Sequence, residues 1–178
     1  AWYSSRGPSW YDGLQKPDLV APGSHMASDV PDKSTIAQEY PGGLIKTKGQ
    51  TNLSMLSGTS MSAGVVTGVV SLMLEASRTN HPGVRLTPTA VKAILEYTAF
   101  DMAGYDTLTQ GAGALNAAGA VALAEAIDPN RPVGTPWLSK AVNTWTTVGG
   151  ETLMWGQRVV WGDRVVWGDQ IFNNDAAW

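Results

Sequence analysis

Small and aliphatic residues occupy every side of one stretch, residues 61–76, which reads MSAGVVTGVVSLMLEA. A helix without a polar stripe is typical of an element that is buried on all sides. The valines and the glycines Gly64 and Gly68 lower the helix propensity of this stretch. The small side chains also let neighbouring elements approach closely, so the pattern predicts a buried central helix over Met61–Ala76.

Two further helices are predicted by their capping residues. Thr87 is a suitable N-cap for a helix over 88–97, whose first residue is a proline and whose apolar side chains share one face. Asn116 is a suitable N-cap for an alanine-rich helix over 117–127. The pair Asp128-Pro129 ends this helix, because the residue before a proline disfavours the helical conformation.

The segments before and after these helices differ in composition. Residues 1–50 are rich in Gly, Pro and Ser, which predicts loop with one or two short strands, and a further strand is predicted over 51–56. Residues 129–150 contain three prolines and two adjacent glycines, as expected of a linker. We therefore divide the chain into a body over 1–128, a linker over 129–150 and a tail over 151–178.

The tail contains three six-residue units, WGQRVV, WGDRVV and WGDQIF, which begin at Trp155, Trp161 and Trp167. Val-Val-Trp favours strand and Gly-Asp favours a turn, so the units predict short hairpins or one turn of a β-stack. Their tryptophans either bind a sugar, peptide or partner surface, or pack against the body of the protein.

Composition narrows the class of protein. A chain of 178 residues with 43% hydrophobic and 15% charged residues is expected to form one globular domain. The net charge of −3 does not favour nucleic acid as a partner. The most apolar run, residues 65–74, is interrupted by Thr67, Gly68 and Ser71, so no membrane span is predicted. The chain has no cysteine, which excludes disulfides and thiolate metal sites.

Ser60 is the strongest candidate nucleophile. It follows Gly58 and lies at the start of the predicted central helix, where unpaired backbone N–H groups and the helix dipole favour a developing anion. The backbone N–H of Ser60 itself is therefore a candidate oxyanion donor. The G-x-S-x-G elbow of another hydrolase class does not fit, because Ser62 occupies the position of its second glycine. A simple helix cap is the alternative reading of such a hydroxyl.

The segment GTSMSAG around Ser60 resembles the nucleophile motif of the subtilisin-like serine proteases, the subtilases. Three other segments resemble parts of the same catalytic domain in the same order: YSSRGP at 3–8, KPDLVAPG at 16–23 and GAGALNAAGAVALA at 111–124. The resemblance covers residues 2 to about 127. One departure is Gly64-Val65, which stands where the family commonly has Pro-His.

The resemblance implies a serine endopeptidase that acts on protein or peptide substrates through an acyl-enzyme. Ser60 is then the nucleophile, and Gly58, Thr59 and Met61 are its structural neighbours. The implied fold is the C-terminal half of an α/β catalytic domain, with a mostly parallel sheet flanked by helices. The family is typically secreted, and the resemblance implies an extracellular location.

A serine nucleophile needs a general base, and in subtilases the chain order Asp, His, Ser places that base before the serine. His81 follows Ser60. His25 precedes it, but Ser24 and Met26 replace the His-Gly-Thr context of the family. The family's Asp-Ser/Thr-Gly context and the oxyanion asparagine before YSSRGP are absent as well. We therefore interpret the chain as the C-terminal part of the catalytic domain. The Asp, His and Asn are expected upstream of Ala1, and that missing part is expected as a partner.

This interpretation predicts that the chain is inactive and marginally stable alone. The alternative function is a non-catalytic scaffold whose tryptophan-rich tail binds a partner or surface. No cofactor or metal is predicted from the residues, although the resemblance allows calcium. Asp163, Asp169 and Asp175 recur every six residues, which does not match the EF-hand loop.

Overall fold

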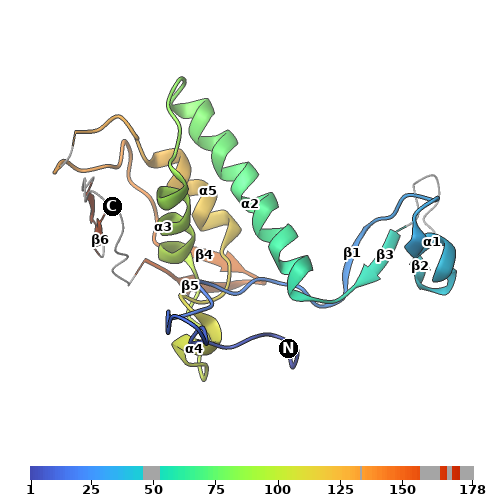
Figure 1. The fold of residues 1–178 in the computed structure, drawn as a ribbon. Coiled ribbons are helices and arrows are strands. Elements are labelled where there is room, and N and C mark those ends of the chain that lie inside the picture. Colours follow the sequence, from blue (N-terminus) through green and yellow to red (C-terminus); the bar gives the residue numbers. More distant parts are fainter. Residues whose placement is uncertain (46–52, 133, 157–164, 168–169, 173–178) are drawn as a thin grey trace. The chain divides into compact units, whose positions relative to one another are not determined.

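The computed structural model describes residues 1–178 apart from 46–52, 133, 157–164, 168–169 and 173–178 (Figure 1). The chain divides into two compact units. The first unit comprises residues 1–4 and 21–65, and the second comprises residues 5–20 and 66–178. We describe each unit by itself.

The first unit contains a small antiparallel sheet. Its strands are β1 (Met26–Asp29), β2 (Leu44–Ile45) and β3 (Leu53–Leu56), in the order β1-β3-β2. β3 confirms the strand predicted over 51–56 within its described residues. Between β1 and β2 lie the short helix α1 (Thr35–Glu39) and the 3₁₀ helix η1 (Pro41–Gly43), which the sequence analysis did not predict.

Helix α2 spans Thr59–Asn80, so it extends beyond both ends of the predicted Met61–Ala76. Its buried residues are Val69, Met73 and Ser77, which recur every four residues and form one stripe. Leu72, on another side, is 58% exposed. The prediction of a helix buried on all sides is therefore wrong for this structure, because the described elements cover α2 along one face only.

By length and composition, α2 is also the one described helix that qualifies as a membrane span. An 18-residue window within it has a mean hydropathy of 1.3, and 11% of that window is buried. The core helix of a water-soluble protein meets the same criterion. The prediction that the chain has no membrane span thus stays a prediction.

The two other predicted helices are confirmed together with their caps. α3 spans Pro88–Thr98, and the Thr87 hydroxyl accepts a hydrogen bond from the N–H of Ala90 at 3.1 Å. α5 spans Ala117–Ala126, and the Asn116 side chain accepts from the N–H of Gly119 at 3.0 Å. Each cap satisfies a donor that the first helical turn leaves without a partner. The one-turn helix α4 (Thr107–Gln110) lies between them in sequence.

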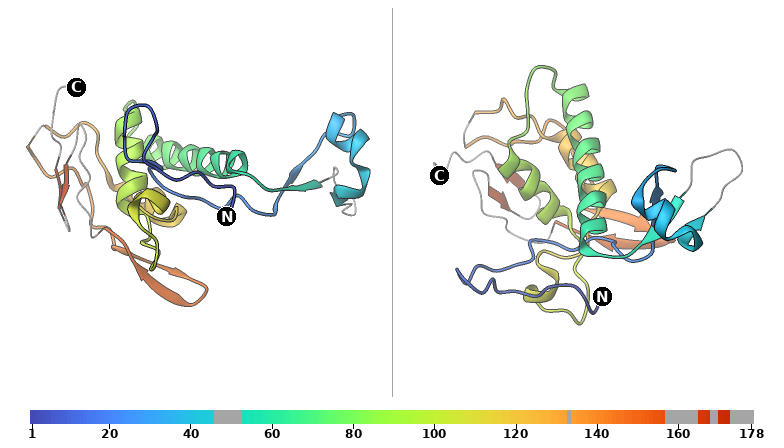
Figure 2. Two further views of the ribbon diagram at one scale, coloured as in Figure 1. Left: turned by 60° about the horizontal axis from the view of Figure 1, so that its bottom comes forward. Right: turned by 45° about the vertical axis from the view of Figure 1, so that its right-hand side comes forward.

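The core of the second unit is formed by side chains from α2, α3 and α5, which lie close to one another in both views of Figure 2. Its largest fully buried apolar side chains are Met73, Ile94, Tyr97, Leu123, Ile127 and Trp137. Trp137 comes from the segment predicted as a linker, and the backbone N–H of Asp128 donates to its carbonyl at 2.9 Å. This part of residues 129–150 therefore packs into the core.

Two β-hairpins follow in the second unit. β4 (Trp145–Val148) pairs antiparallel with β5 (Glu151–Met154) across Gly149 and Gly150, whose φ values are 59° and 89°. A two-residue turn with positive φ at both positions matches the twist of a hairpin. β6 (Val165–Trp167) pairs antiparallel with β7 (Gln170–Phe172) within the predicted repeat tail. Residues 157–164, which make up most of the units that begin at Trp155 and Trp161, lie outside the described residues.

The predicted parallel sheet is not confirmed. Every pair of named strands in the described ranges is antiparallel, and parallel pairing there amounts to one bridge between Val20 and Ala114. A parallel sheet needs several strands joined by crossovers. The described residues thus support the coarser class, a mixed α/β structure, and not the specific sheet.

Candidate active site

Ser60 lies in the first compact unit, at a place where a strand, a turn and a helix follow one another. β3 ends at Leu56, Ser57 and Gly58 form the turn, and α2 begins at Thr59 (Figure 1). Ser60 is the second residue of α2, and its side chain is exposed. A serine in this position presents its hydroxyl to solvent at the positive end of the helix dipole.

The turn leaves backbone donors beside this hydroxyl. The carbonyl of Gly58 accepts from the N–H of Met61 at 3.1 Å and from the N–H of Ser62 at 3.4 Å. The N–H of Ser60 belongs to the first helical turn, so it has no carbonyl four residues earlier within the helix. The role of this N–H as an oxyanion donor stays a prediction.

The segment Ala21–Gly23 lies directly against this turn. The N–H of Gly58 donates to the carbonyl of Gly23 at 2.7 Å, and the Ser62 hydroxyl donates to the carbonyl of Ala21 at 3.0 Å. A Cβ atom at Gly23 would lie 2.1 Å from the Ser62 oxygen and 2.6 Å from the Gly58 carbonyl oxygen. Position 23 therefore accepts only glycine without a local rearrangement.

The glycine before the nucleophile is not the sterically restricted one. Gly58 is not among the positive-φ glycines, and a Cβ there would meet Met61 Sδ at an ordinary 3.4 Å. Gly23 is the position where a side chain would clash with the turn, and the Ser62 hydroxyl donates the hydrogen bond that holds the turn against residues 21–23. Sequence reasoning missed both positions, although Gly23 ends the family-like segment KPDLVAPG.

His25, the histidine that precedes Ser60 in the chain, does not bond to it. Its backbone φ is 55°, its N–H donates to the Ser57 hydroxyl at 2.9 Å, and its Nδ1 lies 3.0 Å from the Ser24 hydroxyl. The imidazole is exposed. This arrangement agrees with the interpretation of His25 as a surface loop residue.

His81 lies in the second unit, at the C-terminal end of α2. Its Nδ1 is 3.9 Å from a carboxylate oxygen of Asp128, and its Nε2 is buried without a hydrogen-bond partner. Within the described part of the first unit, His25 makes no hydrogen bond to Ser60.

The described residues contain no group of three or more His, Cys, Asp or Glu side chains arranged to hold a metal ion. Asp163, Asp169 and Asp175, which the sequence analysis weighed for calcium, lie outside the described residues. A calcium site is therefore suggested by the family resemblance alone.

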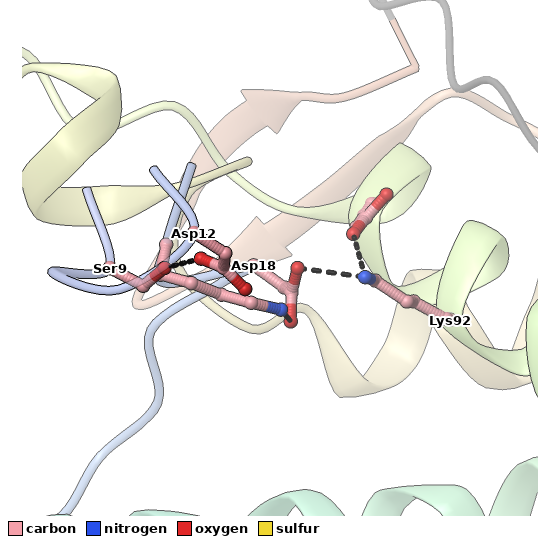
Figure 3. Close-up of polar contacts among 6 residues, drawn as sticks. Ser9, Asp12, Asp18 and Lys92 are labelled. Atoms are coloured by element: carbon pink, nitrogen blue, oxygen red, sulfur yellow. Dashed lines mark hydrogen bonds and ion pairs between the residues drawn. The ribbon is translucent and has the colours of Figure 1, made fainter. Parts of the chain in front are cut away.

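The segment KPDLVAPG begins in the second unit, where Asp18 joins it to α3. The carboxylate of Asp18 accepts from Lys16 Nζ at 2.7 Å and pairs with Lys92 Nζ at 2.8 Å (Figure 3). Burial alone would raise the pKa of Asp18, but the two ammonium groups hold it below its ordinary value. Partial burial raises the pKa of Glu96, although Lys92 lies 3.7 Å away.

The segment YSSRGP is tied to α4 in the same unit. Arg6 donates to the carboxylate of Asp106 at 2.7 Å, and the N–H of Gly7 donates to the carbonyl of Leu108 at 2.9 Å. A hydrogen bond from the Thr109 hydroxyl, and then the Arg6 charge, lower the pKa of Asp106. The loop thereby acquires a fixed register on α4.

The segment GAGALN requires its glycines for close backbone approach. Gly111 has a φ of 61°, and a Cβ atom there would lie 2.2 Å from the carbonyl oxygen of Pro17. Gly113 has a φ of 126°, and a Cβ atom there would lie 2.0 Å from the carbonyl oxygen of Phe100. Residues 17–20 and 111–115, far apart in the chain, therefore lie against each other.

An exposed serine that follows a strand and a turn and opens a helix has the local setting expected of the nucleophile of a serine hydrolase. The comparisons with known proteins then give the family. The model of the Subtilase family matches residues 1–136. The chain belongs to the subtilase family, a family of serine-type peptidases, and the resemblance noted from its motifs is confirmed.

Three relatives illustrate the similarity. The chain is 31% identical to Pyrolysin of Pyrococcus furiosus over 79% of this chain and 9% of that protein. It is 34% identical to Serine protease AprX of Bacillus subtilis over 68% of this chain and 25% of that protein. It is 32% identical to Subtilisin-like protease SBT2.2 of Arabidopsis thaliana over 62% of this chain and 12% of that protein. The chain thus spans a quarter or less of the length of these relatives.

Proposed function

We propose that this chain carries the nucleophile of a serine-type endopeptidase, and that Ser60 is that nucleophile. The observation that carries the proposal is the position of Ser60 in GTSMS, exposed in the first turn of α2, in a chain of the subtilase family. Thr59 and Met61 flank it, and Gly58 closes the turn before it. Ser62 holds this turn against the segment that ends at Gly23.

The proposed reaction is acyl transfer. Ser60 Oγ attacks the carbonyl carbon of the scissile peptide bond while its proton moves to a histidine imidazole. The carbonyl oxygen becomes an anion, which the backbone N–H of Ser60 stabilises as one of its donors. The imidazolium then protonates the leaving amine, and water hydrolyses the acyl-enzyme by the reverse proton movements.

The base for this reaction is proposed to come from residues outside the 178. His25 makes no hydrogen bond to Ser60 in the described ranges, and His81 follows the serine in the chain, unlike the base of the family. A serine hydroxyl without a base is a weak nucleophile. We propose that the Asp, the His and the oxyanion Asn belong to an upstream part of the same catalytic domain, and that the 178 residues alone do not hydrolyse peptides.

The exposed apolar side of α2 supports the proposal that an upstream part of the domain completes the site. Leu72 is 58% exposed, and 11% of the apolar window of α2 is buried. An apolar helix in water gains free energy when a second surface covers it, at about 25 cal/mol per Å² of apolar area. We propose that the upstream part of the domain covers this side and completes the site.

The test begins with the coding sequence upstream of Ala1. An open frame with Asp-Ser/Thr-Gly, then His-Gly-Thr, then an asparagine loop is expected. The extended polypeptide should cleave a denatured protein substrate, and the Ser60→Ala variant should lose this cleavage by several orders of magnitude. Ser9→Ala serves as a matched control, because it removes a hydroxyl from a loop distant in sequence. Cleavage that survives Ser60→Ala would contradict the proposal.

A second function, a non-catalytic scaffold whose tail binds a partner, is favoured by the position of His25, which makes no hydrogen bond to Ser60 within the described residues. An upstream segment with substituted Asp and His positions would support this alternative. We propose a protein or peptide substrate, an extracellular location by family resemblance, and no nucleic-acid partner. Calcium is allowed by the family, and a chelator-dependent loss of thermal stability in the extended polypeptide would reveal it.

A further inference from the structure

A cavity of about 320 Å³ lies in the second unit, between α5 and residues 140–146. It does not include Ser60 or any residue of the candidate active site. Its volume falls at the lower end of the range of about 300–1,000 Å³ that holds small ligands. No step of the proposed peptidase reaction uses it.

Small residues form the α5 side of this cavity. Ala118, Gly119 and Ala122 contribute no long side chain, so they leave an open apolar surface along one helix face. A Cβ atom at Gly119 would lie 2.4 Å from Asn116 Nδ2 and 3.1 Å from the ring of Trp155. Glycine at 119 therefore lets the Trp155 ring approach α5 and form a wall of the cavity.

Hydrogen bonds hold the opposite wall in place. Thr146 Oγ1 accepts from Asn116 Nδ2 at 3.2 Å and from Trp155 Nε1 at 2.9 Å. The ring of Trp155, which is 3% exposed, packs edge-to-face on Tyr97 at 6.1 Å. Both acceptor positions of the Thr146 hydroxyl are used, so its O–H remains as a donor toward a ligand. The cavity is therefore largely pre-formed.

The rim combines an aromatic ring with polar groups. Trp145 lines the cavity and is 46% exposed. Asn143 lines it beside Trp145, and its exposed amide makes no hydrogen bond within the described ranges. Glu125 and Lys140 pair with each other at the rim. Their charges cancel, so the rim offers donors and acceptors without favouring an ionic ligand.

We propose that this cavity binds a neutral saccharide of one or two rings. A pyranose has an apolar C–H face, which fits the half-exposed ring of Trp145 and the small-residue surface of α5. Its hydroxyls both donate and accept, as do the groups on the rim: the Asn143 amide, the Thr146 hydroxyl and the Glu125–Lys140 pair. A purely apolar ligand would leave the Asn143 amide and the Thr146 O–H without partners.

The test is a titration of the polypeptide extended upstream of Ala1, followed by ¹H–¹⁵N spectra of the tryptophan indole groups. The probes are methyl β-D-glucopyranoside, cellobiose and N,N′-diacetylchitobiose. At least one saccharide is expected to shift the Trp145 indole resonance in a saturable way. Trp145→Ala should weaken the binding, measured on the remaining pocket resonances, by about tenfold or more.

Two further variants keep the result interpretable. Trp10→Ala removes a tryptophan that is 93% exposed in the same unit, and it should leave the affinity unchanged. Ala118→Leu extends a side chain from an exposed α5 position into the cavity, and it should weaken binding while the thermal melt is retained.

Three outcomes would overturn the proposal. One is the absence of any saccharide-induced shift up to the solubility limit of the sugars. Another is an equal loss of affinity in Trp10→Ala and Trp145→Ala. The third is a saturable shift with a tryptophan-containing tripeptide but not with the saccharides, which would reassign the cavity to aromatic side chains. Each outcome is independent of whether Ser60 is a nucleophile.

Discussion

Gly23→Ala tests how the nucleophile turn is held. The new Cβ would lie 2.1 Å from the Ser62 oxygen and 2.6 Å from the Gly58 carbonyl oxygen, so the two segments must separate. The hydrogen bonds from the Gly58 N–H to Gly23 and from the Ser62 hydroxyl to Ala21 are then lost or lengthened. Two such bonds together contribute about 1–3 kcal/mol. The free energy of local opening at Gly58 should fall by that amount.

The assay is native-state hydrogen exchange of the Gly58 amide. A loss of about 1–3 kcal/mol corresponds to exchange that is faster by about 5-fold to 150-fold. Gly64→Ala is the matched control, because no atom lies within 4 Å of its added Cβ and the position is helical. It should stabilise α2 by about 0.5–1 kcal/mol. Unchanged protection of Gly58 in Gly23→Ala, or equal effects of the two substitutions, would refute the steric reasoning.

Three further substitutions test other parts of the structure. Lys92→Met should raise the lowered pKa of Asp18. The Asp18 carboxylate contributes stability that is lost as pH falls through its folded pKa, and this contribution should shrink in the variant. An unshifted ¹³C carboxyl titration would contradict this. Met73→Ala should lower the free energy of unfolding by about 2–5 kcal/mol in chemical denaturation, because Met73 is fully buried. Leu72→Ala should lower it by less than about 0.5 kcal/mol in the 178-residue chain. Equal losses would be inconsistent with a single buried stripe on α2. Thr146→Val should lower the thermal midpoint and reduce the free energy of unfolding by about 1–3 kcal/mol, because the buried indole N–H of Trp155 loses its acceptor. An unchanged midpoint would count against the hydrogen bond between Trp155 and Thr146.

The helices of the second unit were predictable because their signals are local. Thr87 and Asn116 cap α3 and α5 through bonds to residues three positions later, so the sequence alone specifies both starts. The apolar period of α3 likewise predicts its buried face, which includes Ile94 and Tyr97. The order of the four family-like motifs gave the family for the same reason, since each motif is a short contiguous segment.

The features that escaped prediction depend on partners distant in the chain. Whether Leu72 is buried depends on which surface covers α2, and its own sequence carries no information on that surface. The parallel sheet was expected from the family, but the described strands supply one parallel bridge, at Val20. Trp137 lies in a proline-rich segment that resembles a linker, yet its ring fills the core.

At the candidate site, the sequence identified Ser60 but not what holds it. The contact between Gly23 and Ser62 joins two segments that are separated by more than half of the first unit. A glycine that is required by a distant side chain looks, in sequence, like any glycine in a loop. The role of His25 was easier to judge, because its neighbours already differ from the histidine motif of the family.

The central claim, that Ser60 is the nucleophile of a peptidase completed by residues outside this chain, is tested most directly by covalent labelling. The polypeptide extended upstream of Ala1 is treated with a serine-reactive phosphonate, digested and mapped by mass spectrometry. The label is expected on Ser60; it should be absent in Ser60→Ala and retained in Ser9→Ala. Labelling of the extended polypeptide at another serine, or no labelling despite intact Asp and His motifs, would contradict the account.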